Sequence, residues 1–341
     1  MPHSKVPTTA SSHTIHGVQL HVNDGLLAPT DVCEMRISYP TEPINELYRR
    51  YKDDGYVLLK GLLPRQDVFA AREAYFASLA STGILQPGTA AVDGIFNSSA
   101  STSDYPGIGA SSLDVKTDTN NPAGRFVEAA VKTHTEPWYN GSEKDGIAGF
   151  CNHPILRDFV ANIVGWGKDI LTVRRTLLRN NTPGNRAIGV HYDQIFMRYG
   201  EPTAVTAWVP IGDVRIEGGG LIYLEGGDQV GREMEEEFSR KAKAAGMSDQ
   251  ETRNAFNANM TSTGFLSESP REFARDRGRR WLVSAYEAGD VVLHTPHMIH
   301  ASTINHDPEG RIRLGTDLRF VNSKRPWDKR WDKDFALDDG L

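Results

Sequence analysis

The stretch AVTAWVPIGDVRIEGGGLIYL, residues 204–224, contains two short apolar segments separated by a turn that is rich in glycine. The first segment, residues 204–210, and the second, residues 221–224, are rich in β-branched, aromatic and aliphatic residues. Short segments of this composition between glycine turns are typical of antiparallel β-strands. A doubly wound sheet would need a helix between them, and the intervening residues leave no room for one.

Similar short apolar segments occur on both sides of this stretch. Further strands are expected at residues 170–178, 187–197, 281–286, 290–294 and 313–321. Helical spacing of apolar residues predicts helices near 44–54, 63–79, 122–133 and 153–164. These patterns predict a mainly β (α+β) fold, a double-stranded β-helix (jelly roll, cupin-like) flanked by N-terminal helices and a helical insertion.

The chain has 341 residues, a length that one domain of this kind can fill. We expect an N-terminal arm over residues 1–40, a single domain over 41–325 and a C-terminal tail over 326–341. Residues 228–280 form the insertion, which is predicted to be helical at 233–245 and to serve as a lid or as the contact of a homodimer. Residues 84–118 are rich in Gly, Ser, Pro and Thr and are expected to form a long loop that shapes a site.

The composition excludes several classes of protein. A formal net charge of −6, with basic residues spread along the chain, argues against a nucleic-acid partner. No run of about 18 apolar residues is present to span a membrane, and the first ten residues lack an apolar signal core. With two cysteines, Cys33 and Cys151, the chain has no disulfide framework or thiolate zinc site. A cytoplasmic location is expected, with any metal held by histidine and carboxylate.

The segment GVHYDQ, residues 189–194, supplies one histidine and one carboxylate two positions apart. On a strand, residues i and i+2 project from the same face, so His191 and Asp193 would point together. An H-x-D pair alone is weak evidence of a metal site, because it also occurs in exposed strands and turns. A transition metal would also need a third ligand from elsewhere in the chain.

Three histidines compete for that third place: His294, His297 and His300. Arg311 follows His300 by eleven residues, beyond a turn at residues 307–310 that would bring its guanidinium back toward the metal. Ser302 follows His300 by two residues and would share its face. We therefore predict His300 as the third ligand. Two histidines and one carboxylate occupy one face of an octahedral iron and leave three positions open.

These residues resemble a known family. The segment YKDDGYVLL (51–59), the pair His191 and Asp193, the strand TAWVP (206–210), the glycine turn at 218–221 and the block from Gly289 to Arg311 are similar to the phytanoyl-CoA dioxygenase (PhyH) family. This family comprises Fe(II)/2-oxoglutarate-dependent oxygenases, and the resemblance covers about residues 46–322. The family often has Gly-Ser-His after the glycine turn, where this chain has Gly226-Gly227-Asp228.

The resemblance implies an activity and a set of roles. His191, Asp193 and His300 would bind Fe(II). Arg311 and Ser302 would hold the distal carboxylate of 2-oxoglutarate, and Trp208 would line its pocket. With O2 as the other co-substrate, the enzyme would oxidise an unactivated C–H bond of a small molecule and release succinate and CO2. Arg175 and Arg179 could face the same cavity, although an outward orientation is favoured from the sequence.

Several alternatives stay open at this stage. One is a metal-dependent cupin-type enzyme that does not use 2-oxoglutarate, which Arg311 argues against. A second is an acyl-CoA hydroxylase of the same family. A third is a non-catalytic scaffold, which the complete H-x-D and distal histidine set argues against. A secondary-metabolite or amino-acid-type substrate is favoured, whereas hydroxylation, desaturation and cyclisation are not distinguished.

Overall fold

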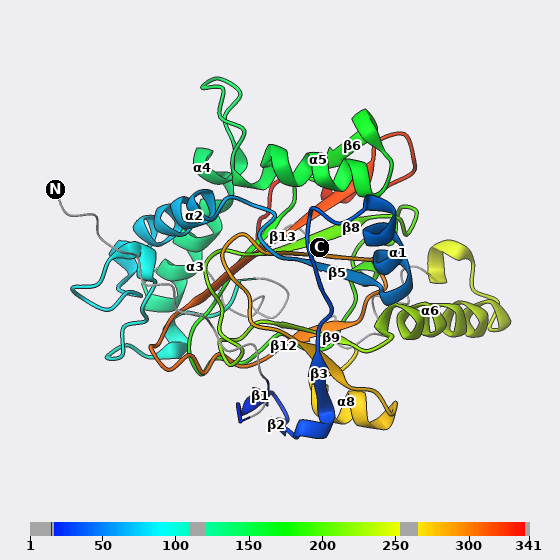
Figure 1. Cartoon of the computed structure of the whole chain (residues 1–341), viewed down its shortest axis with the longest axis horizontal. Helices are drawn as coiled ribbons and strands as arrows, with labels where there is room; N and C mark the ends of the chain where they lie inside the picture. The colour runs from blue at the N-terminus through cyan, green and yellow to red at the C-terminus, as the bar shows by residue number, and fades with distance from the viewer. Residues whose placement is uncertain (1–14, 16, 109–119, 253–264, 338–341) are drawn as a thin grey trace.

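The structure is a computed structural model that describes residues 15, 17–108, 120–252 and 265–337 (Figure 1). Its larger sheet runs in the order β4-β5-β11-β8-β13-β6, and β7 also pairs with β13. The bounds of these strands are Ile37–Ser38, Tyr56–Leu59, Val291–His294, Val205–Pro210, Arg313–Asn322 and Ile170–Thr172, with β7 at Leu177–Asn181. The smaller sheet runs β12-β9-β10-β3, with bounds His300–Ser302, Leu221–Leu224, Trp281–Val283 and Val32–Glu34. Trp208 of the larger sheet and Leu221 of the smaller line one cavity, so the two sheets face each other.

Five helices cover the outer face of the larger sheet (Figure 1). They are α1 (Ile44–Asp54), α2 (Arg65–Ser78), α3 (Pro122–Lys132), α4 (Pro137–Asn140) and α5 (Pro154–Ile163). Their apolar faces pack with outward residues of the sheet, such as Leu59, Ala207 and Leu293. In the part of the chain that the structure describes, no helix is both long and apolar enough to cross a membrane.

Strand β13 shows how the alternation of side chains creates a site. Leu314, Leu318 and Phe320 belong to the core beneath the helices. Arg313 and Asp317, at alternating positions, line the cavity between the sheets. Because successive residues of a strand point to opposite faces, the same strand builds the hydrophobic core on one side and a polar interior on the other.

The predicted fold class is confirmed: the chain is a mainly β jelly roll flanked by helices. Two segments differ from expectation. Residues 20–38 are packed on the domain rather than forming a loose arm, because β3 pairs in parallel with β10 and β4 with β5. Residues 187–197 do not form a strand. They contain isolated bridges at Val190 and His191 and then a 3-10 turn, η9 (Asp193–Ile195). Of the expected loop at 84–118, residues 109–118 lie outside the described part.

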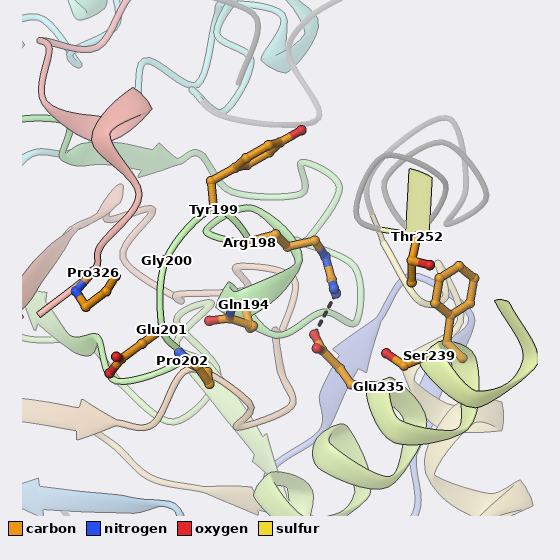
Figure 2. Close-up of a pocket in the computed structure, with 11 residues that line it drawn as sticks. Gln194, Arg198, Tyr199, Gly200, Glu201, Pro202, Glu235, Ser239, Thr252 and Pro326 are labelled. Atoms are coloured by element: carbon orange, nitrogen blue, oxygen red, sulfur yellow. Dashed lines mark hydrogen bonds and ion pairs between the residues drawn. The ribbon is translucent and has the colours of Figure 1, made fainter. Parts of the chain in front are cut away.

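The insertion contributes a long helix, α6 (Gly227–Ala244), and a short one, α8 (Pro270–Asp276). Helix α6 begins six residues before the helix predicted from charge spacing at 233. Its residues Val230, Met234 and Phe238 pack on a second apolar cluster that contains Tyr192 and Ile299. A cavity of about 480 Å³ lies between α6 and the segment that follows Asp193 (Figure 2), with Gln194, Arg198, Tyr199, Glu235, Phe238 and Thr252 among its lining residues.

Candidate metal centre

A backbone bridge brings two histidines from distant parts of the chain together. His191 and His300 are directly opposite in an antiparallel bridge. The His191 amide donates to the His300 carbonyl at 3.0 Å, and the His300 amide donates back at 2.8 Å. Directly opposite residues of antiparallel strands project to the same face. The two imidazole rings therefore enter the space between the sheets together, with their centroids 4.2 Å apart.

Each of these histidines is oriented by a carbonyl two residues earlier. Nδ1 of His191 lies 2.9 Å from the Gly189 oxygen, and Nδ1 of His300 lies 2.9 Å from the Met298 oxygen. A carbonyl oxygen can only accept a hydrogen bond, so Nδ1 carries the proton on each ring. The lone pair then lies on Nε2, where it is available to a metal.

Burial also keeps both imidazoles neutral. Burial lowers the pKa of His300 to about 4, and the neighbouring His294 contributes to the lowering. The pKa of His191 lies well below its usual value because the ring is buried and His300 is close. Both rings are consequently neutral at neutral pH, with Nε2 unprotonated, as metal coordination requires.

Asp193 is held as a carboxylate by three donors. Its Oδ1 accepts from Nη2 of Arg319 at 3.0 Å. Its Oδ2 accepts from the Thr206 hydroxyl and lies 3.3 Å from Nε2 of His294. Burial opposes ionisation, but Arg319 and His294 hold the pKa of Asp193 well below its ordinary value. A carboxylate has about four acceptor positions, so this arrangement leaves one of them, on Oδ1, for a further partner.

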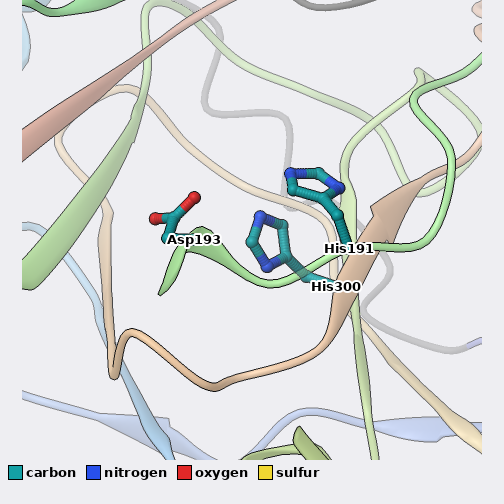
Figure 3. Close-up of side chains that lie close together, drawn as sticks. All are labelled: His191, Asp193 and His300. Atoms are coloured by element: carbon teal, nitrogen blue, oxygen red, sulfur yellow. The ribbon is translucent and has the colours of Figure 1, made fainter. Parts of the chain in front are cut away.

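The three predicted ligands meet (Figure 3). His191, Asp193 and His300 are buried, and one ligand atom from each lies within 4.8 Å of the others. The donor set of two neutral imidazoles and one carboxylate is the one that non-haem iron(II) oxygenases use, and it leaves positions open for O2 and a co-substrate. The residues present therefore fit an iron(II) ion.

The two competing histidines are both buried, but they have different neighbours. His294 is fully buried, with its ring centroid 4.7 Å from that of His300. It belongs to the immediate surroundings of the site through its contact with Asp193. His297 points toward α6, where its Nε2 lies 3.9 Å from Oε2 of Glu235. Neither faces solvent.

A narrow cavity adjoins the two imidazoles. Its described lining consists of Arg179, Ile188, His191, Trp208, Leu221, His300, Arg313, Gly315 and Asp317. With a volume of about 10 Å³ it has room for about one water molecule. Trp208, predicted to line the co-substrate pocket, lies in the wall of this cavity. Arg179 also faces inward, contrary to the orientation favoured from the sequence.

The other two predicted co-substrate residues lie elsewhere. The side chain of Arg311 is 36% exposed and pairs with Glu309 at 2.6 Å. Arg311 precedes β13 and bridges to Ile95, so it sits at the edge of the sheet rather than inside. Ser302 is buried, and its hydroxyl accepts from the Ile188 amide at 3.0 Å. Neither residue lines the cavity.

Sequence reasoning gave no site role to four residues that the structure places here: Thr206, Arg313, Asp317 and Arg319. All four occupy inward positions of β8 and β13, where Arg319 is paired with Thr206 and Asp317 with Trp208. The available signal was the alternation of charged and apolar residues along 313–320. Charged residues at 313, 317 and 319 of a buried strand are costly unless each charge has a partner.

The sequence matches a known protein family. The family model of phytanoyl-CoA dioxygenase (PhyH) matches residues 51–312. A search of curated proteins found no match.

Solved structures also resemble the chain. The carbocyclase SnoK from nogalamycin biosynthesis is 15% identical, with 84% of this chain and 87% of that one covered and a TM-score of 0.45. AviO1 from Streptomyces viridochromogenes is 15% identical over 84% and 98%, with a TM-score of 0.46. EctD from S. alaskensis is 14% identical over 94% and 89%, with a TM-score of 0.45. Likeness at this level carries no information on substrate or reaction.

Proposed function

Because the chain belongs to the phytanoyl-CoA dioxygenase family of non-haem Fe(II)/2-oxoglutarate-dependent oxygenases, we propose that it oxidises an unactivated C–H bond of a small molecule. His191, Asp193 and His300 would hold the iron. The observation that carries this assignment is the convergence of their three ligand atoms within 4.8 Å, from segments far apart in the chain. When bound, iron with 2-oxoglutarate and O2 supplies the oxidising chemistry, and succinate and CO2 are released.

The protein's own residues prepare the ligands. The Gly189 and Met298 carbonyls fix the ring tautomers, so that each Nε2 keeps its lone pair. Arg319 and Thr206 orient the Asp193 carboxylate, and the guanidinium charge keeps it ionised. The carboxylate would therefore need no proton loss when the metal arrives.

Arg313 and Arg179 are the best placed groups to bind the distal carboxylate of 2-oxoglutarate. Both line the cavity beside the imidazoles. Burial, with repulsion from Arg179, lowers the pKa of Arg313 to about 10, so this cation lacks full compensation. Nε of Arg179 is buried without a hydrogen-bond partner among the described residues. A bidentate carboxylate would satisfy such groups.

Asp317 currently occupies part of that space. Its Oδ2 lies 3.6 Å from Nε of Arg179, and the cavity is too small for a dicarboxylate as it stands. Binding of 2-oxoglutarate would therefore displace Asp317 from Arg179 and widen the cavity. Arg311, at the edge of the sheet, is the alternative partner that the family resemblance implies.

The substrate side of the site is aromatic. The ring centroid of Phe265 lies 5.6 Å from that of His191, and the centroid of Phe196 lies 6.0 Å from it. Such walls favour a substrate that presents an apolar carbon to the metal. The substrate we propose is a secondary metabolite or amino-acid-type molecule that is hydroxylated, desaturated or cyclised.

An anaerobic titration with Fe(II) and 2-oxoglutarate tests the cofactor assignment. A weak visible charge-transfer band is expected for the wild type and is lost in His191→Ala, whose fold is checked by circular dichroism. A folded wild type without the band would favour the scaffold alternative. Succinate release across a metabolite panel, with mass spectrometry of products, then identifies the substrate. Turnover without succinate would favour a cupin-type enzyme.

A further inference from the structure

Helix α6 lies against the segment that leads into His300. Gly227, Gly231 and Glu235 are spaced by four residues and so share one face of the helix. A Cβ added to Gly231 would lie 2.2 Å from the His297 carbonyl oxygen, and one added to Gly227 would lie 3.1 Å from the Ile299 amide nitrogen. The helix backbone therefore touches the chain directly before the third proposed ligand.

Glu235 is the next residue along that face, and it contacts both ligand-bearing segments. Its Oε1 accepts from Nη2 of Arg198 at 2.6 Å (Figure 2). Its Oε2 lies 3.9 Å from Nε2 of His297. The side chains of Arg198 and His297 are 8% and 6% exposed, and that of Glu235 is 19% exposed. One largely buried carboxylate thus joins a residue that follows Asp193 to a residue that precedes His300.

Tyr192 brings the same carboxylate close to the ligands themselves. It stands between His191 and Asp193 in the chain, and its ring centroid lies 5.9 Å from that of His297. The Tyr192 side chain also interacts electrostatically with the Glu235 carboxylate. The two segments also meet directly, because the Gln194 amide donates to the Pro296 carbonyl at 2.8 Å.

We propose that Glu235 is a positioning residue for the metal centre: by binding Arg198 and facing His297, it fixes the spacing of the segments that carry the ligands. The inference rests on the proposed function of His191, Asp193 and His300. Metal sites tolerate displacements of only about 0.5 Å, and loss of an outer partner typically lowers metal affinity by about 10- to 100-fold. The insertion would then stabilise the metal site by holding the two ligand-bearing segments at a fixed spacing.

Three variants separate positioning from simple charge burial. Glu235→Gln keeps the size of the side chain and removes its charge. Glu236→Gln makes the same change at the adjacent exposed position, where the ion pair is absent. The double variant Arg198→Met with Glu235→Gln removes both charges, so that no buried cation is left without a counter-ion. The double variant keeps the net charge of the wild type but lacks the ion pair between Arg198 and Glu235.

The measurement is Co²⁺ affinity, from titration of the Co²⁺ visible absorption bands, together with the thermal unfolding midpoint of each metal-free protein. We expect Glu235→Gln and the double variant to bind Co²⁺ about tenfold more weakly or worse, with altered band positions, and Glu236→Gln to stay within about twofold of wild type. The double variant should recover unfolding temperature but not affinity.

Two results would overturn the inference. One is a folded Glu235→Gln protein that binds Co²⁺ as the wild type does. The other is a double variant that recovers affinity as well as stability, which would mean that Glu235 only neutralises Arg198. Failure of the proposed function looks different, because the wild type itself would then bind no Co²⁺ or would bind it undiminished after His191→Ala.

Discussion

Asp193 illustrates how much of the site is prepared before any metal arrives. A buried carboxylate is expensive without a counter-charge, and Arg319 provides one from the neighbouring strand at 3.0 Å. Thr206 and His294 fill the other oxygen. One acceptor position remains, on the oxygen that also faces Arg319. At the scale of single residues, the Asp193 carboxylate is held ionised and oriented by groups that are themselves buried.

The choice between Arg313 and Arg311 is tested by 2-oxoglutarate affinity. Arg313→Met removes a buried guanidinium from the cavity, whereas Arg311→Met removes one that is paired at the surface. We expect the dissociation constant for 2-oxoglutarate, read from the Fe(II) charge-transfer band, to rise at least about tenfold for Arg313→Met and less than about threefold for Arg311→Met. The opposite order would restore the role that the resemblance gave to Arg311.

His134 makes a residue-scale contribution to stability that depends on pH. It is buried, its Nε2 accepts from the Leu178 amide at 3.0 Å, and Nδ1 lies 3.1 Å from the Val131 carbonyl. Burial lowers its pKa from 6.5 to about 4. The unfolded chain therefore binds more protons than the folded one between about pH 4 and pH 6.5, and stability falls as pH falls through that window.

The test compares wild type with His134→Gln by urea unfolding at pH 7 and pH 5. For a shift of this size the linked loss is about 2 kcal/mol between the two values. The fall in the free energy of unfolding should be smaller by about that amount in the variant. An equal fall in both proteins would show that His134 is not buried in its neutral form.

At the scale of elements, the packing of α6 is the most restrictive feature. Glycine within a helix normally costs stability, so replacing it with alanine at an open position stabilises by about 1 kcal/mol. At Gly231 the added methyl would meet the His297 carbonyl oxygen. We expect Gly231→Ala to lower the free energy of unfolding by about 2 kcal/mol, measured in urea. The control Gln229→Ala, at an exposed position of α6, should show no loss. A stabilised Gly231→Ala would contradict the close approach.

The elements also show what the sequence could and could not determine. Strands such as β8 and β9 and helices such as α1 were predicted within about two residues, because their periodicity is strong. The segment that carries His191 and Asp193 was expected to be a strand, and it contains two isolated bridges, at Val190 and His191, followed by a turn. The two side chains still converge, but the turn and the partner His300 bring them together, and neither can be read from spacing.

The assignment of the co-substrate arginine shows a related limit. Positions 311 and 313 have the same parity, so spacing does not distinguish them. Their depth differs because β13 begins at Arg313, while Arg311 lies before it and bridges to Ile95. The burial of each arginine depends on where the strand begins and on which segment packs against its first residues. Both are set by tertiary structure.

At the scale of the whole molecule, the site is a product of two sheets and one insertion. The larger sheet supplies Thr206, His294 and Arg319, and the smaller supplies His300. The N-terminal strand β3 completes the smaller sheet by pairing in parallel with β10. That pairing joins residues 32–34 to residues 281–283, and no local sequence pattern predicts it. The family, by contrast, could be named from its motifs, because each of the two segments that carry the ligands, residues 189–194 and 289–311, is short and continuous in sequence.

The reciprocal bridge between His191 and His300 has a kinetic consequence. Each amide donates to the carbonyl oxygen of the other residue, so neither proton can exchange with deuterated water until the two segments separate. A metal ion bound by both imidazoles would oppose the separation of the two segments. Adding Co²⁺ should therefore slow amide hydrogen exchange at positions 191 and 300 together, and more than at Val190, whose amide donates to Ser267. Unchanged exchange at both would place the ion elsewhere.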